Sequence, residues 1–142
     1  MTRNKGFTLI ELMVVILIVA ILAAVIVPML RARIDAAKWS EGRAGIGTIS
    51  TAARAFWAEH QDQAAIANAP LIGTLFPITS DLDGKYFQYA CYAITYQAYD
   101  TTNVAYTITC TAATSLRPGK PTAPATMTLT VAADGSSVWS QT

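Results

Sequence analysis

The feature that most constrains this chain is an uninterrupted apolar run near its N-terminus. Nineteen uncharged residues, 12–30, lie between Glu11 and Arg31. A helix of roughly 20 such residues can cross the hydrocarbon core of a bilayer, which is about 30 Å thick. The run is longer than the core of an ordinary signal peptide, and no convincing A-x-A cleavage site closes it. The sequence therefore predicts a membrane-spanning helix rather than an ordinary signal peptide.

The composition of the 142 residues agrees with a membrane segment and argues against several classes of function. Hydrophobic residues make up 53 % and charged residues 13 %, about half the charged share of a typical soluble protein. A net charge of +1 offers no basic surface for nucleic acid, so no nucleic-acid partner is expected. With a single histidine and no Walker A, GxGxxG or GxSxG motif, we expect no metal site, no cofactor and no enzymatic activity.

The charges that flank the apolar run suggest an orientation and single out one acid. Arg3 and Lys5 precede the run, which places the N-terminus in the cytoplasm by the positive-inside rule. Glu11 immediately precedes the apolar run. Moving its carboxylate into the hydrocarbon of a bilayer would cost on the order of 2.5–3.5 kcal/mol. A residue with that cost needs a partner or a role.

The hexapeptide at 6–11, GFTLIE, followed by the apolar run with Pro28 inside it, resembles the class III signal of type IV pilins and type II secretion pseudopilins. The match covers residues 5–28. It implies that a prepilin peptidase cuts after Gly6 and N-methylates Phe7. It also implies a filament of identical subunits, an inner-membrane assembly platform driven by an ATPase, and transfer from the inner membrane to an extracellular pilus.

Glu11 and Pro28 are the two assembly residues in this interpretation. In a bundle of such helices without water, Glu11 would neutralise the Phe7 amine of a neighbouring copy and fix the axial register. The alternative is a pair within one helix, because Phe7 and Glu11 are four residues apart. Pro28 either ends the membrane helix or bends a continuous one, and we favour the continuous helix because small and apolar residues continue at helical spacing.

The sequence predicts an α+β fold in four parts: a leader peptide at 1–6, a membrane and filament-core helix at 7–30, an amphipathic continuation at 31–62, and a β-sheet head at 63–142. The long helix, half of it transmembrane, would run over 7–61 and pack against a small antiparallel sheet. Three glycines, Gly42, Gly45 and Gly47, either weaken the helix or let a neighbour approach closely. His60, near the helix end, is assigned a cap-like role. The apolar stripe that would face the head comprises Ile34, Ala37, Ala44, Ile46, Ile49, Ala52, Ala53, Phe56 and Trp57, with Arg33, Lys38, Glu41, Arg54 and Glu59 on the opposite face.

The head is expected to hold three to four antiparallel strands, at 91–99, 104–111, 126–131 and 137–140. Residues 80–84 predict a turn, in which Gly84 is free to take a positive φ. Centring the first hairpin turn, 100–103, between its first two residues sets Cys91 opposite Cys110. Facing residues are within reach of a disulfide, and the compartment outside the membrane is oxidising. We therefore expect that disulfide, with two buried free thiols as the alternative.

The leading function is a structural subunit, a pilin, of a helical type IV pilus-like filament. The first alternative is a minor pseudopilin of a type II secretion system. A secreted monomeric binding module, for which the N-terminus is only a targeting device, is a further alternative. The sequence leaves open whether such a filament serves adhesion, motility, DNA uptake or secretion.

Overall fold

The computed structural model describes residues 6–60, 72–76, 79–99 and 104–142. It contains two compact units, Met1–Ile34 and Asp35–Thr142. Helix α1 (Leu9–Glu59) runs through the boundary between them, and the second unit adds a four-stranded antiparallel sheet. The predicted α+β class is confirmed.

The part of α1 in the first unit is exposed on every side. All residues from Gly6 to Ile34 are exposed, and the helix continues through Pro28 without a break. The prediction of a continuous helix at this proline is confirmed. The predicted start at Phe7 was two residues too early, because Thr8 caps the helix and Leu9 is its first residue.

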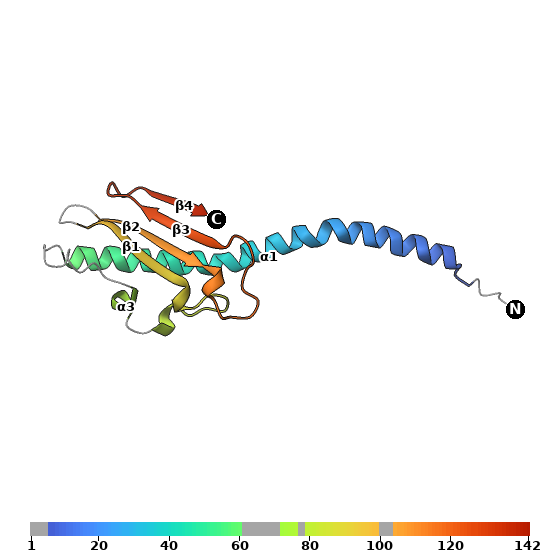
Figure 1. Cartoon of the computed structure of the whole chain (residues 1–142), viewed down its shortest axis with the longest axis horizontal. Helices are drawn as coiled ribbons and strands as arrows, with labels where there is room; N and C mark the ends of the chain where they lie inside the picture. Colours follow the sequence, from blue (N-terminus) through green and yellow to red (C-terminus); the bar gives the residue numbers. More distant parts are fainter. Residues whose placement is uncertain (1–5, 61–71, 77–78, 100–103) are drawn as a thin grey trace. The chain divides into compact units, whose positions relative to one another are not determined.

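The sheet consists of β1 (Tyr92–Tyr99), β2 (Val104–Thr111), β3 (Thr126–Val131) and β4 (Ser137–Gln141). The spatial order is β1-β2-β3-β4, with every pair antiparallel (Figure 1). These bounds match the predicted strands to within one residue at each end. Short helices complete the unit: α3 (Ile72–Leu75), η1 (Thr79–Leu82), η2 (Tyr89–Cys91) and η3 (Ala112–Thr114).

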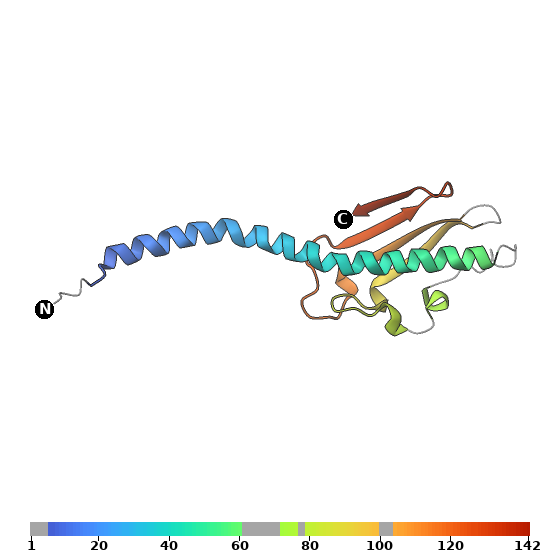
Figure 2. The same ribbon diagram turned by 180° about the vertical axis from the view of Figure 1, so that it is seen from behind.

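Within the second unit, α1 lies along one face of the sheet (Figures 1 and 2). Buried strand residues such as Ile108 and Leu129 join buried helix residues in a single core. The buried positions of α1 follow the predicted stripe in part: Ile46, Ile49 and Ala53 are buried as expected. Ile34, Ala37 and Ala44 are exposed, and two polar residues, a tryptophan and a glycine are buried instead. The buried residues recur every three or four positions, as one helix face requires: Asp35, Trp39, Gly42, Ile46, Ile49, Ser50 and Ala53.

The predicted end of α1 near residue 61 was slightly late. The helix ends at Glu59 and His60 follows it outside the helix, while residues 61 and 62 lie outside the described residues. The hairpin turn at 100–103 also lies outside them.

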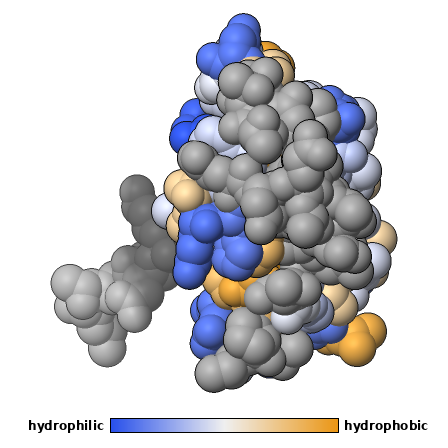
Figure 3. Space-filling model, turned by 90° about the vertical axis from the view of Figure 1, so that its left-hand side faces the viewer, coloured by the Kyte–Doolittle hydropathy of each residue, from blue (hydrophilic) through white to orange (hydrophobic). Residues whose placement is uncertain are grey.

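The described surface at the end of the molecule drawn at the left of Figure 1 mixes hydrophilic and hydrophobic residues (Figure 3).

Two of the three helix glycines are needed for close packing. A Cβ on Gly42 would lie 2.9 Å from Cε3 of Trp39, and a Cβ on Gly45 would overlap the phenol group of Tyr92. Both aromatic side chains are buried. Gly47 has nothing within 4 Å of an added Cβ. At Gly45 the close neighbour that the sequence left undefined is therefore Tyr92 of the head, and at Gly42 it is Trp39 of the same helix together with Phe87 of the head, whose Cε2 would lie 3.2 Å from an added Cβ.

We expect alanine to have opposite effects at Gly45 and Gly47. Gly45→Ala should destabilise the head by about 1–3 kcal/mol, because the buried Tyr92 ring must move. Gly47→Ala should stabilise it by up to about 1 kcal/mol, because alanine is the better helix former and meets no neighbour. Thermal unfolding of the full chain in detergent, followed by circular dichroism, measures both. Shifts of the same sign would contradict this account of the packing.

Candidate processing and assembly site

The proposed cleavage bond, Gly6–Phe7, is accessible. Both residues precede the helix and are exposed, with Phe7 at 80 %. A Cβ on Gly6 would meet nothing within 4 Å, so packing within the chain does not require glycine here.

Glu11 and Thr8 form a capping box at the start of α1. The Glu11 carboxylate Oε2 accepts hydrogen bonds from the Thr8 backbone N–H at 2.9 Å and from the Thr8 hydroxyl at 2.6 Å. The Glu11 N–H donates in return to the Thr8 hydroxyl at 3.3 Å. The role of Thr8 was missed by the sequence analysis, although Thr-x-x-Glu before an apolar run is the signature of this motif. Glu11 therefore has a local partner in the uncleaved chain.

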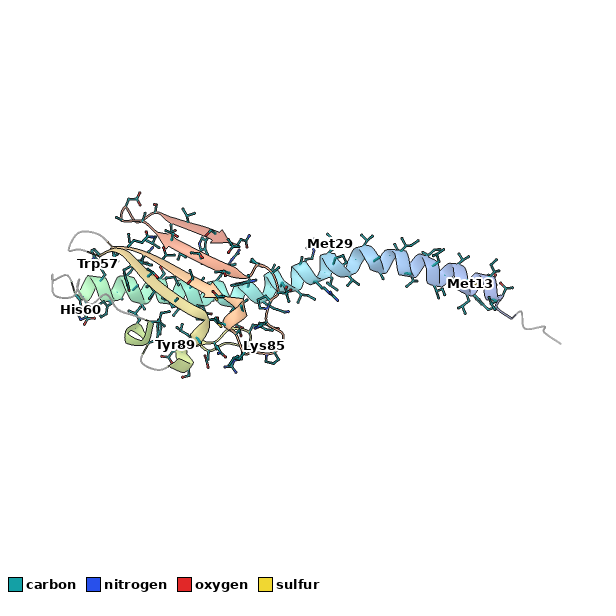
Figure 4. The ribbon with its side chains drawn as sticks, viewed as in Figure 1. Met13, Met29, Trp57, His60, Lys85 and Tyr89 are labelled. Atoms are coloured by element: carbon teal, nitrogen blue, oxygen red, sulfur yellow. The ribbon has the colours of Figure 1, made fainter. Side chains whose placement is uncertain are left out.

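The segment that follows Glu11 offers only apolar surface. Among the described residues, α1 is the one helix long and apolar enough to cross a membrane, and none of its most apolar window is buried. The side chains of Met13 and Met29 project away from the helix (Figure 4). A helix that is apolar all round needs lipid or other helices around it. A shallow apolar groove on this segment is lined by Ile10, Met13, Val14, Ile16, Leu17 and Ala20.

The strand register places the two cysteines differently from the prediction. Cys110 on β2 faces Tyr92, not Cys91, which ends η2 immediately before β1. Beside the hairpin turn the ladder pairs Tyr99 with Val104, which is two residues away from the predicted register. The irregularity between Tyr96 and Ala98 reverses one of these two residues, because an extra residue on one strand moves every later pair. Both cysteines are free and buried in this structure.

Burial makes Cys110 chemically inert in the folded head. Burial, together with the nearby Cys91 thiol, raises the pKa of the Cys110 thiol to about 12. The thiol is then protonated at neutral pH, and only the thiolate attacks a disulfide. If the Cys91–Cys110 bond forms, it forms before the head closes over the pair.

The Cys91–Cys110 disulfide remains a prediction, with a direct chemical measurement. The native protein, unfolded without reductant, should take up no alkylating reagent, and after reduction it should take up two alkyl groups. The bond would close a loop of about 20 residues and stabilise the head by roughly 3 kcal/mol. Double alkylation before reduction would show that the cysteines are free, and Cys110→Ser serves as the single-thiol control.

Two acidic residues of α1 bind the helix to the head. Neither contact was predicted from the sequence. Asp35 is 7 % exposed, and its Oδ2 accepts from the Thr122 hydroxyl at 2.6 Å and from the Thr122 N–H at 2.9 Å. These bonds, led by the hydroxyl, lower the pKa of Asp35 to about 2. Lys38 lies 3.2 Å from the other oxygen of Asp35. The Asp35 carboxylate therefore links α1 to the loop that precedes β3.

Glu41, predicted on the solvent face, is the second of these acids. Its Oε1 accepts from the N–H groups of Tyr86 and Phe87, both at 2.8 Å, and its Oε2 accepts from the N–H of Lys85 at 3.1 Å. A Cβ on Gly84 would overlap this carboxylate. Gly84 does not adopt the positive φ that the sequence left open to it, and its lack of a side chain is needed for space instead.

Other polar contacts hold the remaining length of the helix. The buried Tyr106 hydroxyl lies 2.8 Å from the Ser50 hydroxyl and accepts from Nε of Arg54 at 3.2 Å. His60 stacks on Phe56 with ring centroids 4.1 Å apart, and its Nδ1 lies 3.1 Å from the Phe56 carbonyl oxygen. The last contact is of the capping kind predicted for His60. The described residues contain no group of three or more His, Cys, Asp or Glu side chains that could hold a metal ion.

The N-terminal part of the chain is similar in sequence to known proteins. Residues 1–27 match the family model for the prokaryotic N-terminal methylation motif. The type IV major pilin protein PilA of Myxococcus xanthus is 39 % identical over 46 % of this chain and 30 % of its own length. A type IV major pilin protein PilE1 of Neisseria gonorrhoeae is 40 % identical over 60 % of this chain and 50 % of its own.

A secretion protein matches as well. The type II secretion system core protein G of Pseudomonas aeruginosa is 46 % identical over 35 % of this chain and 35 % of its own. The chain thus spans half or less of the length of these relatives, and no solved structure matches it. The N-terminal motif and these relatives confirm the resemblance seen in the sequence: the chain is similar to the type IV pilins and type II secretion pseudopilins.

Proposed function

We propose that this chain is a structural subunit of a type IV pilus-like filament that assembles through the N-terminal part of α1. The observation that carries the proposal is the fully exposed apolar segment, which begins with a methylation motif and contains Glu11 as its one acid. Such a surface is stable only in lipid or among like helices. A filament that grows by repeating the same helix contact is heterologous and does not close.

The processing step follows from the accessible Gly6–Phe7 bond. In this proposal residues 1–6 are a leader, and a prepilin peptidase removes them on the cytoplasmic side and methylates Phe7. Cleavage removes Arg3 and Lys5, which leaves eight basic against nine acidic side chains. It also creates an amine beside the apolar helix, where a carboxylate is its natural partner.

Glu11 supplies that carboxylate in the assembled filament. In the uncleaved chain the Glu11 carboxylate accepts two hydrogen bonds from Thr8. These bonds partly compensate its charge before the subunit enters a filament. In a filament without water around the helices, the neighbour's Phe7 ammonium would replace these weaker bonds. Any other register would leave two charges buried and unpaired. The alternative is a pair between Glu11 and the Phe7 amine of the same chain.

The remaining parts take their roles from this arrangement. Residues 7–30 would span the inner membrane and later form the filament core, with Pro28 inside the continuous helix. Residues 31–62 would continue the stalk, and residues 63–142 would form the head on the outside. Moving the apolar segment out of lipid gains no hydrophobic free energy, so extraction needs an inner-membrane platform driven by an ATPase. The final location would be an extracellular pilus.

The similarity to a type II secretion core protein supports a second candidate, a pseudopilin. The two candidates share the same processing and helix contact and differ in where the filament ends. A secreted monomeric binding module is the third candidate, although nothing in the described residues favours it over the other two. The names of the relatives denote pilins and a secretion-system component, and we assign no catalytic activity.

The test is the state of the N-terminus and of the assembly in native material. Mass spectrometry of sheared surface filaments should find this chain beginning at N-methylated Phe7. Abundant chain in sheared filaments favours a pilus, whereas processed chain that stays with the cell envelope favours a pseudopilin. A soluble monomer that lacks the whole apolar segment would overturn both.

A further inference from the structure

Among the residues that the structure describes, none covers the edge of the head formed by β4, so its backbone groups and its side chains are both accessible. β4 is the last strand of the sheet, and all five of its residues are exposed. Thr126 and Thr142 exchange both backbone hydrogen bonds, which fixes the alternation of the antiparallel ladder. Even-numbered residues of β4 therefore bond to β3, while Ser137, Trp139 and Gln141 direct their N–H and C=O groups to the free edge.

Trp139 adds an uncovered aromatic ring to this edge. It pairs with Leu129 across the ladder, so its side chain lies on the sheet face that packs on α1. Leu129 is 5 % exposed, yet Trp139 is 47 % exposed, because the helix does not cover the outermost strand. Trp139 instead lines an open groove together with Arg43, Met127, Ser140 and Gln141.

Arg43 supplies an unneutralised charge to the same groove. It is exposed on α1, and its Nε contacts the Met127 sulfur at 3.3 Å. No acid of the described chain lies within ion-pair distance of its guanidinium. Tryptophan and arginine are the residue types most enriched at the energetic centres of protein interfaces. We name the surface made by β4 and Arg43 the β4 edge.

The opposite side of the head carries the complementary charge. Figures 1 and 2 both place β4 at one side of the unit and α3 and η1 at the other. Asp81 on η1 is exposed and has no ion pair within the described residues. Its neighbour Asp83 is already paired with Arg117 at 3.1 Å. Asp81 is therefore an acid on that side that is available to a cation from another molecule.

We propose that the β4 edge docks against the η1 side of a second copy of this chain, with Arg43 of one copy facing Asp81 of the next. The proposal rests on the filament function, since copies related by one repeated operation meet through opposite edges. The free backbone groups of β4 and the Trp139 ring become covered in the same contact. The edge is then protected in the filament, although it is open in the single chain.

A charge exchange in the full chain tests the contact. Arg43→Glu and Asp81→Arg should each lower the yield of sheared filaments at least tenfold, with an unchanged amount of processed subunit in the membrane. The double variant should restore the yield to within twofold of wild type. Wild-type yield from Arg43→Glu, or a double variant no better than the singles, would overturn the proposal while leaving the filament function intact.

A second measurement does not depend on yield. Trp139 replaced by photoreactive p-benzoylphenylalanine should crosslink, in intact filaments, to a peptide of residues 79–91 from another copy. Crosslinks only to other peptides, or no crosslink, would also overturn the proposal. Leu116→Ala, which truncates a loop side chain that is 86 % exposed, is the control for loss of an exposed hydrophobic side chain elsewhere on the head and should assemble normally. Absence of filaments from the wild-type chain would instead refute the filament function and, with it, this contact.

Discussion

Replacing Glu11 by alanine is expected to lower the yield of filaments at least a hundredfold. The proposed contact buries the Phe7 ammonium of one subunit against the Glu11 carboxylate of the next. Removing one member of a buried pair leaves the other charge uncompensated, which costs about 3–5 kcal/mol, or a factor above one hundred in an equilibrium. The readout is chain recovered in sheared filaments relative to processed chain in the membrane.

Because Glu11 also belongs to a capping box, Glu11→Gln distinguishes its capping role from its charge. Glutamine at position 11 can still accept hydrogen bonds from Thr8, because glutamine serves as well as glutamate in a capping box. It cannot neutralise an ammonium. If charge pairing drives docking, Glu11→Gln should fail to assemble as Glu11→Ala does. If Glu11 acts only as a cap, Glu11→Gln should assemble and Thr8→Ala should show the defect.

Two controls complete the comparison. Glu59→Ala removes an exposed acid without an ion pair in the described chain and should leave filaments unchanged. The N-terminus of each variant must be shown to be processed, so that a failure of cleavage is not read as a failure of docking. Normal filament number and length from Glu11→Ala would show that the register argument is wrong.

The N-terminal segment and the strands could be predicted because their signals are local. A run of 19 uncharged residues has few possible environments, and alternation in β-rich segments between turn residues locates strands directly. The strand bounds are accordingly within one residue of the predicted ones. The capping role of Thr8 could also have been predicted, because the Thr-x-x-Glu motif lies within four residues.

The joint between helix and head could not be predicted, because each of its contacts joins distant parts of the chain. Asp35 bonds a residue 87 positions away, and Glu41 bonds residues 44 to 46 positions away. From the sequence, a charge on a helix is expected to face solvent. The cysteine register was wrong because turn residues at 100–103 locate a hairpin without fixing its centre: Tyr99 pairs with Val104, two residues from the predicted register, and the irregularity in β1 reverses only one of the two. Tertiary partners, not local preference, decide such positions.

Glu41→Ala is expected to be strongly destabilising, because this side chain of α1 holds a turn of the head. The carboxylate accepts three backbone hydrogen bonds from 85–87, and Phe87 is fully buried. A bond to a charged group contributes about 1.5–3 kcal/mol, and a buried N–H left without an acceptor costs about 1–3 kcal/mol. Allowing for water at the exposed Lys85, we expect a loss of about 3–4 kcal/mol in the free energy of unfolding.

Thermal or urea unfolding of the full chain in detergent measures this loss, and Glu59→Ala on the same helix is the matched control. Glu41→Gln should lose less than Glu41→Ala, because one acceptor oxygen remains for the N–H groups of Tyr86 and Phe87. Equal stability of Glu41→Ala and Glu59→Ala would show that the three bonds contribute nothing net.

Gly84 offers an independent check on the same contact, since its hydrogen lies where a Cβ would overlap the Glu41 carboxylate. Gly84→Ala alone should destabilise the head by about 1–3 kcal/mol, the usual cost of overpacking. In the Glu41→Ala background the obstructing carboxylate is gone, so the same substitution should cost much less. The two changes should therefore be strongly non-additive, as expected for groups in direct contact. Additive effects would mean that Gly84 is required for some other reason, and that the carboxylate does not occupy the space beside it.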